Sequence, residues 1–132
     1  MKHLLFLEDE EFQIEMIRGY YDRCPLHKIA TAEFTQSPLA AMDRAKQGGI
    51  DYVILDMRLG NVSGYNVISN IARQPCKPKI WAYTAFPKET DIRNRFIDEY
   101  ILKSRGVGYL FSKLEAVILK DEPIICELTL SS

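Results

Sequence analysis

Short apolar runs alternate with segments of helical periodicity along this chain, and this alternation constrains the fold more than any other feature. Three runs are strand-favouring and too short for buried helices: residues 4–7, Tyr52–Leu55 and Lys79–Thr84. The first two stop abruptly at carboxylates, Glu8 and Asp56. Parallel strands need long crossover connections, which are usually helices. The alternation therefore predicts an α/β protein with a mostly parallel sheet and helices on both of its faces.

The full set of expected elements is five strands and four main helices. The strands are expected at residues 4–7, 27–34, 52–55, 79–84 and 107–112. The first helix should turn Phe12, Met16 and Tyr20 inward, with Ile17 and Tyr21 widening the apolar stripe. The second helix should begin after an N-cap at Ser37. The third helix must finish before Pro75, and the fourth should run from residue 90 to about 101 and be closed by Gly106.

Polar side chains follow the expected strands at the edge where open parallel sheets bind ligands. The candidates are Glu8, Asp9 and Glu10 after the first strand, Asp56 after the third, Thr84 at the end of the fourth, and Lys113 after the fifth. Converging carboxylates need a compensating cation, and hard oxygen ligands of this kind suit Mg²⁺. A carboxylate beside Mg²⁺ can attack phosphorus, and a lysine can neutralise the transferred group. Each of these residues alone is more often a solvated loop residue or a cap than part of a site, so the hypothesis depends on their joint occurrence at successive strand ends.

Composition narrows the class of protein. A net charge of -1 gives no overall attraction to nucleic acid or to anionic membranes, and no apolar run is long enough to cross a bilayer. Three widely spaced cysteines, Cys24, Cys76 and Cys126, favour reduced thiols in a cytoplasmic protein. We therefore expect neither direct nucleic-acid binding nor a membrane partner.

Four segments together resemble the receiver domain of bacterial two-component response regulators, over nearly the whole chain. They are residues 6–10 (FLEDE), residues 54–59 (ILDMRL) with Gly64 eight residues after Asp56, residues 82–85 (AYTA), and residues 106–113, which end in Lys113 seven positions after a glycine. The resemblance implies a flavodoxin-like, doubly wound, five-stranded parallel sheet of order 2-1-3-4-5.

The resemblance also implies a metal site and a phosphorylation site. Mg²⁺ would be the cofactor, with Asp9 as a direct ligand and Glu8 acting through water. Asp56 and the backbone carbonyl of Arg58 would complete the protein's share of the ligands. The phosphoryl group on Asp56 would come from a sensor histidine kinase or a phosphotransfer protein.

The rest of the implied mechanism is a signalling switch rather than an enzyme. Thr84 and Lys113 would bind the phosphoryl oxygens, and a downstream protein target would read the changed surface. The resemblance implies that the domain receives the phosphoryl group and promotes its own dephosphorylation, and that it is cytoplasmic.

The C-terminal third departs from the family pattern. The segment from Thr84 to Gly106 is longer than the family norm, which predicts an extended fourth helix. We expect the receiver domain at residues 1–120 and an atypical extension of the same domain at 121–132. Residues 124–130 resemble an extra strand, and a homodimer through helix four, strand five and this tail is a further expectation.

Three other functions compete with the phosphoacceptor hypothesis. A pseudo-receiver would keep the fold and act as a constitutive protein-interaction module, as the unusual tail suggests. A phosphohydrolase would need a second carboxylate near Asp56, where Arg58 stands instead. A flavin carrier would need a phosphate-binding loop after the first strand, where acids stand instead.

Overall fold

One five-stranded parallel sheet organises the chain, in a computed structural model that describes residues 1–60, 62–85 and 95–121. Its order is β2-β1-β3-β6-β7, which is the predicted order 2-1-3-4-5 when only the strands of this sheet are counted. The strands are β1 (Lys2–Leu7), β2 (Ala30–Thr35), β3 (Tyr52–Leu55), β6 (Lys79–Thr84) and β7 (Glu99–Leu102). The doubly wound α/β fold is therefore confirmed.

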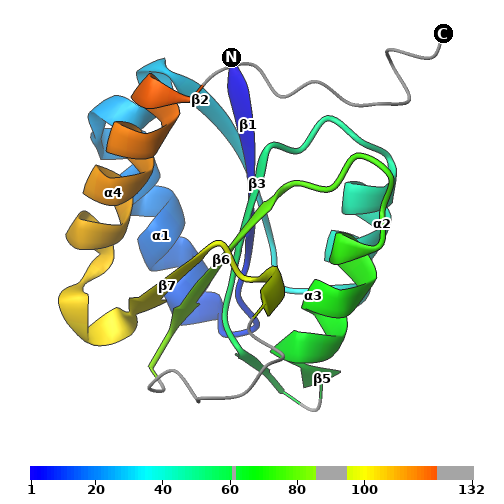
Figure 1. The fold of residues 1–132 in the computed structure, drawn as a ribbon. Helices are drawn as coiled ribbons and strands as arrows, with labels where there is room; N and C mark the ends of the chain where they lie inside the picture. Colours follow the sequence, from blue (N-terminus) through cyan, green and yellow to red (C-terminus); the bar gives the residue numbers. More distant parts are fainter. Residues whose placement is uncertain (61, 86–94, 122–132) are drawn as a thin grey trace, which may run out of the picture.

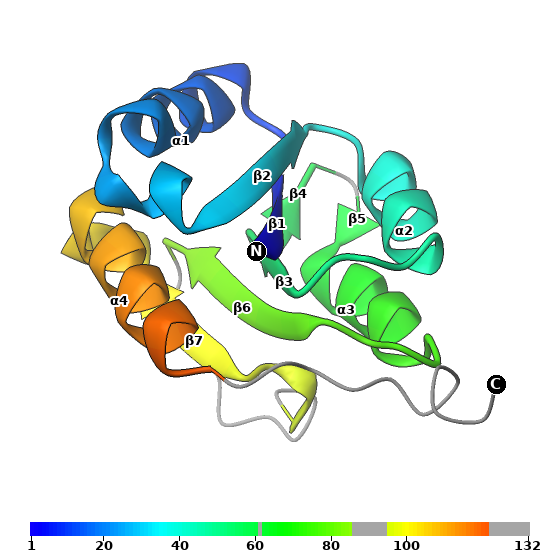
Figure 2. The ribbon, with the colours of Figure 1, turned by 90° about the horizontal axis from the view of Figure 1, so that it is seen from above.

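Among the residues that the structure describes, two helices cover each face of the sheet (Figures 1 and 2). One face carries α1 (Glu11–Arg23) and α4 (Val107–Lys120), and the other carries α2 (Pro38–Lys46) and α3 (Gly64–Ala72). Two 3₁₀ turns, Pro25–Lys28 and Lys103–Arg105, lead into β2 and α4. Within the described residues, no helix combines the length and the apolarity needed to cross a membrane.

Burial on both faces explains why residues 4–7 of β1 form an unbroken apolar run. Successive strand residues point to opposite faces, so Leu4 and Phe6 join the core under α1 and α4, while Leu5 and Leu7 join the core under α2 and α3. Only the strand ends remain for polar residues.

The inward face of α1 agrees only in part with the predicted one. Ile17 is buried and Tyr20 and Tyr21 pack against the core, as predicted, whereas Phe12 is 75% exposed and Ile14 is buried instead. The spacing of Phe12, Met16 and Tyr20 is compatible with a helix but does not say which of two overlapping stripes faces the core. By contrast, the N-cap at Ser37 is confirmed, since its Oγ accepts a hydrogen bond from the backbone N–H of Ala40 at 3.1 Å.

The last third of the chain corrects the predicted element boundaries. Residues 107–112, expected as the fifth strand, form the first part of α4, and the fifth strand is the short β7. The buried residues of α4, Leu110, Phe111, Leu114 and Ile118, follow helical spacing. Because β7 starts at Glu99, the predicted fourth helix cannot reach residue 101, and the length argument for an extended helix fails. Most of that segment, 86–94, and the tail segment 124–130 lie outside the described residues.

The sequence predicts reduced thiols, and this prediction holds for only one of the two cysteines described here. Cys24 is a free thiol, as predicted, whereas Cys76 is disulfide-bonded.

A small hairpin follows β3. Strands β4 (Arg58–Leu59) and β5 (Val62–Ser63) pair in antiparallel fashion, and Gly60 takes a positive φ of 63° at the turn. The chain then returns close to β3, where a Cβ on Gly64 would lie 2.6 Å from the Met57 Cα atom. Only glycine fits at this closing point.

Replacing Gly64 by alanine should destabilise the protein by about 2 kcal/mol or more, because the new methyl group would meet fixed backbone. The matched control is Gly19→Ala inside α1, where the added Cβ makes only an ordinary contact at 3.7 Å. That control should stabilise by about 0.5 kcal/mol through helix propensity. Urea unfolding of both variants measures the difference, and equal effects would contradict the close approach at Gly64.

Candidate functional site

The parallel strands end together at the lower end of the sheet in Figure 1, and four polar residues stand at these strand ends. Glu8 follows β1 and Asp56 follows β3, and their preceding residues Leu7 and Leu55 are register partners. Thr84 ends β6 beside Leu102 of β7, so the next residue, Lys103, lies at the same edge. The strand order reverses between β1 and β3, which is the position where open α/β sheets bind ligands.

Lys103 is the centre of this site. Its Nζ donates to Glu8 Oε2 at 2.8 Å and to Asp56 Oδ2 at 2.9 Å, so one ammonium group bridges the ends of β1, β3 and β7. Glu8 is 2% exposed and Asp56 is 9% exposed. Without a cationic partner, each charged carboxylate would carry a large desolvation free energy.

The prediction that Lys113 would stand at this position is wrong. Lys113 lies on α4, where its Nζ pairs with Glu99 at 2.8 Å. The seven residues that follow Gly106 form the first two turns of α4 and not a strand. Lys113 therefore lies on the helix, away from the strand ends. Sequence reasoning missed Lys103, and the available signal was the short apolar run 100–102 immediately before it.

The Asp56 carboxylate is held through both of its oxygen atoms. Oδ1 accepts the backbone N–H of Arg58 at 3.2 Å, while Oδ2 accepts from Lys103. The backbone N–H of Asp56 in turn donates to the Leu7 carbonyl at 3.3 Å, which extends the β1–β3 pairing to the site itself. A carboxylate fixed in this way presents a defined face to a reagent that enters from solvent.

Burial and shared charge perturb the titration of the site. Burial raises the pKa of Glu8 from 4.5 to about 7, against the opposing hydrogen bond and charge of Lys103 and with help from the charges of Asp56 and Asp9. Burial lowers the pKa of Lys103, but its bonds to Glu8 and Asp56 outweigh this and hold the pKa above 10.5. Lys103 is therefore a permanent cation at neutral pH, and the site holds more negative charge than this one cation balances.

Asp9 and Thr84 complete the predicted set. Asp9 is half-buried next to Glu8, and its Oδ2 would lie 3.4 Å from a Cβ on Gly60, so the β4–β5 turn passes beside this carboxylate. Thr84 is fully buried. Arg58 starts β4 and is exposed. The fold thus brings together Glu8, Asp9, Asp56 and Thr84, as predicted from the sequence, with Lys103 in place of Lys113.

The donor set fits a small hard cation. Mg²⁺ is usually bound by one or two carboxylates and several waters, and Glu8, Asp9 and Asp56 supply only oxygen donors. In the part of the chain that the structure describes, no group of three or more His, Cys, Asp or Glu side chains is arranged to hold a metal ion by itself. An open site with few protein ligands agrees with Mg²⁺ better than with zinc, which takes nitrogen and sulfur ligands.

Comparison with known proteins agrees with this geometry. Residues 4–114 match the family model of the response regulator receiver domain. The chain therefore belongs to the receiver domain family of two-component signalling, whose members are generally phosphoacceptor signalling modules rather than classical enzymes.

Individual relatives are distant in sequence and close in fold. The nisin biosynthesis regulatory protein NisR of Lactococcus lactis subsp. lactis is 25% identical over 121 residues, which cover 90% of this chain and 51% of NisR. The chain thus spans about half the length of this curated relative.

Two solved receiver structures superpose well on the chain. The receiver domain of HemR from Leptospira biflexa has a TM-score of 0.78 at 21% identity, with 93% of this chain and 98% of that chain covered. The response regulator TrrA of Thermotoga maritima, solved in complex with Mg(2+)-BeF, has a TM-score of 0.75 at 24% identity, covering 89% and 99%.

The pKa of Glu8 predicts how stability depends on pH when no divalent cation is bound. A carboxyl group with a raised folded pKa contributes stability that is fully present below pH 4.5 and is lost as the pH rises through about 7. Glu8→Gln should remove this loss and be more stable than the native protein at pH 8 by about 2 kcal/mol, with little difference at pH 4.5.

Urea unfolding in EDTA at several pH values measures this difference. Glu15→Gln, at an exposed position of α1, is the control and should follow the native pH profile. A native-like profile for Glu8→Gln would show that Glu8 is not strained by burial.

Proposed function

We propose that this receiver domain accepts a phosphoryl group on Asp56 and acts as a phosphorylation-dependent signalling switch. The observation that carries the proposal is the buried Asp56 carboxylate held by Lys103 at 2.9 Å, at the ligand-binding edge of the sheet. An Asp56 oxygen attacks phosphorus, a new O–P bond forms, and the bond from phosphorus to the donor's leaving group breaks with its electron pair.

The neighbouring residues would then stabilise the negative charge of the transferred phosphoryl group. Lys103 would shift from the carboxylate to a phosphoryl oxygen, and the Thr84 hydroxyl would donate to another, since preorganised donors are the main catalytic element in phosphoryl transfer. Lys103 takes the role first assigned to Lys113, because only Lys103 of the two contacts Asp56.

Mg²⁺ would neutralise the phosphoryl oxygens while they transfer. The residues that would hold it are Asp9 directly, Glu8 through water, Asp56, and the backbone carbonyl of Arg58. Two observations support this proposal. The Glu8 carboxyl group is buried close to the charges of Asp56 and Asp9, so a bound cation would stabilise its charged form. The three side chains also offer only oxygen donors.

The phosphodonor we propose is a sensor histidine kinase or a phosphotransfer protein of the cytoplasm. The response regulator TrrA has also been solved in complex with the histidine kinase ThkA, and the matched chain of that structure has a TM-score of 0.74 to this chain. This complex supports a histidine kinase as the partner. We propose that the downstream target, or a second copy of the chain, binds the surface formed by β7 and α4. On this surface the cationic groups of Arg105 and Lys113 lie over the ring of Tyr109.

Incubation with a small phosphodonor and Mg²⁺ should add one phosphoryl group to the native protein, as measured by intact-mass spectrometry. Asp56→Asn should give no adduct, whereas Asp43→Asn, at an exposed position of α2, should behave as native. Lys103→Met should slow the reaction about 100-fold, and Lys113→Met should leave it unchanged.

A folded native protein without an adduct would contradict the switch and favour the pseudo-receiver that binds its partner constitutively. An equal decrease in the phosphorylation rate of Lys103→Met and Lys113→Met would contradict the assignment of Lys103 as the site lysine.

Mg²⁺ should raise the melting temperature of the native protein, because a ligand that binds only the folded state stabilises it. At about 100 times the dissociation constant the gain is about 2.7 kcal/mol. Asp9→Asn should lose this gain, while Asp22→Asn, at an exposed position of α1, should keep it. An equal Mg²⁺ response in both variants would place the metal elsewhere.

A further inference from the structure

Tyr83 lies in the same row of the sheet as the two carboxylates that Lys103 bridges. The register of β1, β3 and β6 brings Glu8, Asp56 and Tyr83 to one level, one residue beyond the last paired residue of β3. Tyr83 is 3% exposed and belongs to the core under α1 and α4. It therefore stands between the apolar core and the candidate phosphoacceptor.

The tyrosine and the two carboxylates share one small void. Glu8, Asp56 and Tyr83 line it together with apolar residues of β1, β3 and α1. The void has no room for a water molecule, which needs a larger space and polar partners on several sides. Water is therefore excluded from this side of the carboxylate pair, and Tyr83 is one of the residues that exclude it.

The ring of Tyr83 also contacts the site lysine. Lys103 Nζ lies over the ring, 5.8 Å from its centroid, which is within the range of a cation–π interaction. An ammonium group has three N–H donors, and Glu8 and Asp56 accept two hydrogen bonds from it. Lys103 is therefore held by two carboxylates and by the face of an aromatic ring.

The charge state of the phenol suits this contact. Burial raises the pKa of Tyr83 above 10.0, while the Lys103 ammonium lowers this pKa and the Glu8 charge raises it. The phenol is therefore neutral near pH 7, and the negative face of its ring attracts a cation. A neutral ring attracts the ammonium without adding a further negative charge to the site.

We propose that Tyr83 is a positioning residue for phosphoryl transfer, whose ring holds the Lys103 ammonium beside Asp56. This inference rests on the proposed function, because Lys103 acts on a phosphoryl group only if Asp56 accepts one. In that reaction Lys103 exchanges a carboxylate oxygen for a phosphoryl oxygen. A ring face keeps its attraction while the N–H partners change, since it does not require one fixed N–H direction. The ring thus limits the positions that the ammonium takes during transfer.

The test measures how fast acetyl phosphate with Mg²⁺ phosphorylates each variant, by intact-mass spectrometry. Tyr83→Leu removes the ring and should slow the reaction about 10-fold, whereas Tyr83→Phe keeps the ring and should stay within about twofold of the native rate. Equal rates in Tyr83→Leu and the native protein, or equal slowing in both variants, would overturn this inference alone. A native protein that forms no adduct would overturn the proposed function as well.

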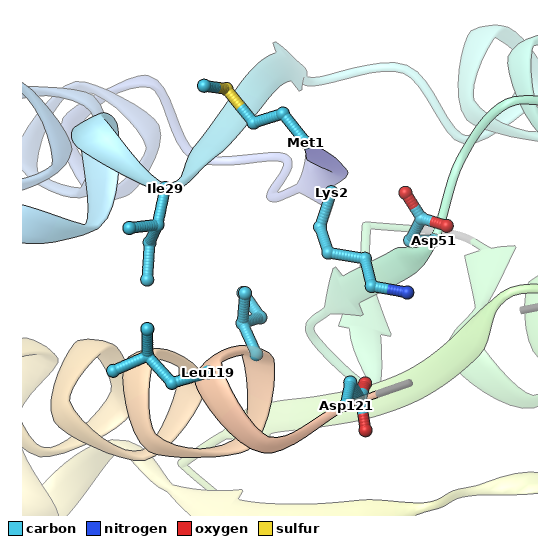
Figure 3. A pocket seen from close by; sticks show the side chains of 7 residues that line it. Met1, Lys2, Ile29, Asp51, Leu119 and Asp121 are labelled. Atoms are coloured by element: carbon cyan, nitrogen blue, oxygen red, sulfur yellow. The ribbon is translucent and has the colours of Figure 1, made fainter. Parts of the chain in front are cut away.

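Tyr52→Leu is the matched control for the loss of a buried tyrosine. Tyr52 is 1% exposed in the same core, and its ring meets Trp81 edge-on with centroids 6.0 Å apart. It begins β3 at the opposite end of the sheet, directly after Asp51, which lines a cavity of about 500 Å³ between the start of β1 and the last turn of α4 (Figure 3). Tyr52→Leu should lower the melting temperature about as much as Tyr83→Leu but leave the phosphorylation rate unchanged. Equal slowing in the two variants would overturn the inference.

Two further measurements separate positioning from a general effect on folding. In a Lys103→Met background, Tyr83→Leu should cause no further slowing, because the ammonium that the ring positions is absent. A further loss of about 10-fold there would overturn the inference. In NMR spectra of the unphosphorylated native protein, the ring current of Tyr83 should shift the ε-methylene protons of Lys103 upfield, and Tyr83→Phe should keep this shift. Lys103 signals at the position of exposed lysines would also overturn the inference.

Discussion

The bridge from Lys103 to Glu8 and Asp56 is the interaction on which the rest of the site depends. It joins the ends of three strands that are far apart in sequence, with separations of 2.8 and 2.9 Å. Two buried carboxylates without this ammonium would face a large desolvation cost. The same bridge keeps Asp56 oriented, so stability and readiness for reaction depend on one side chain.

The sheet makes this bridge possible because its parallel strands end together. Both faces of β1 and β3 are buried under helices, so the only places for polar side chains are the strand ends. One end gathers Glu8, Asp56, Thr84 and Lys103, and the candidate site therefore lies at this end of the sheet.

The sequence predicted the fold and most of the site because the signals for β1, β3 and β6 are strong and local. Each is a short apolar run that ends at a polar residue, and those residues are Glu8, Asp56 and Thr84. The fifth strand was misplaced because β7 begins with the charged Glu99 and is only partly buried, so it lacks the continuous apolar run of the equally short β3. The apolar residues at the start of α4 also fit a strand pattern when only a few residues are considered. The lysine was misplaced with the strand, although the spacing of Leu110, Leu114 and Ile118 favours a helix. Whether Phe12 or Ile14 faces the core of α1 depends on tertiary packing, which the helical period alone does not determine.

A double-mutant cycle between Asp56 and Lys103 tests the central bridge most directly. The free energies of unfolding are measured for Asp56→Asn, Lys103→Met and the double variant, and the same cycle is run with Lys113→Met. We expect a coupling energy of about 1 to 3 kcal/mol for the pair Asp56 and Lys103, and close to zero for the pair Asp56 and Lys113. No coupling to Lys103, or a larger coupling to Lys113, would contradict a site built around Lys103.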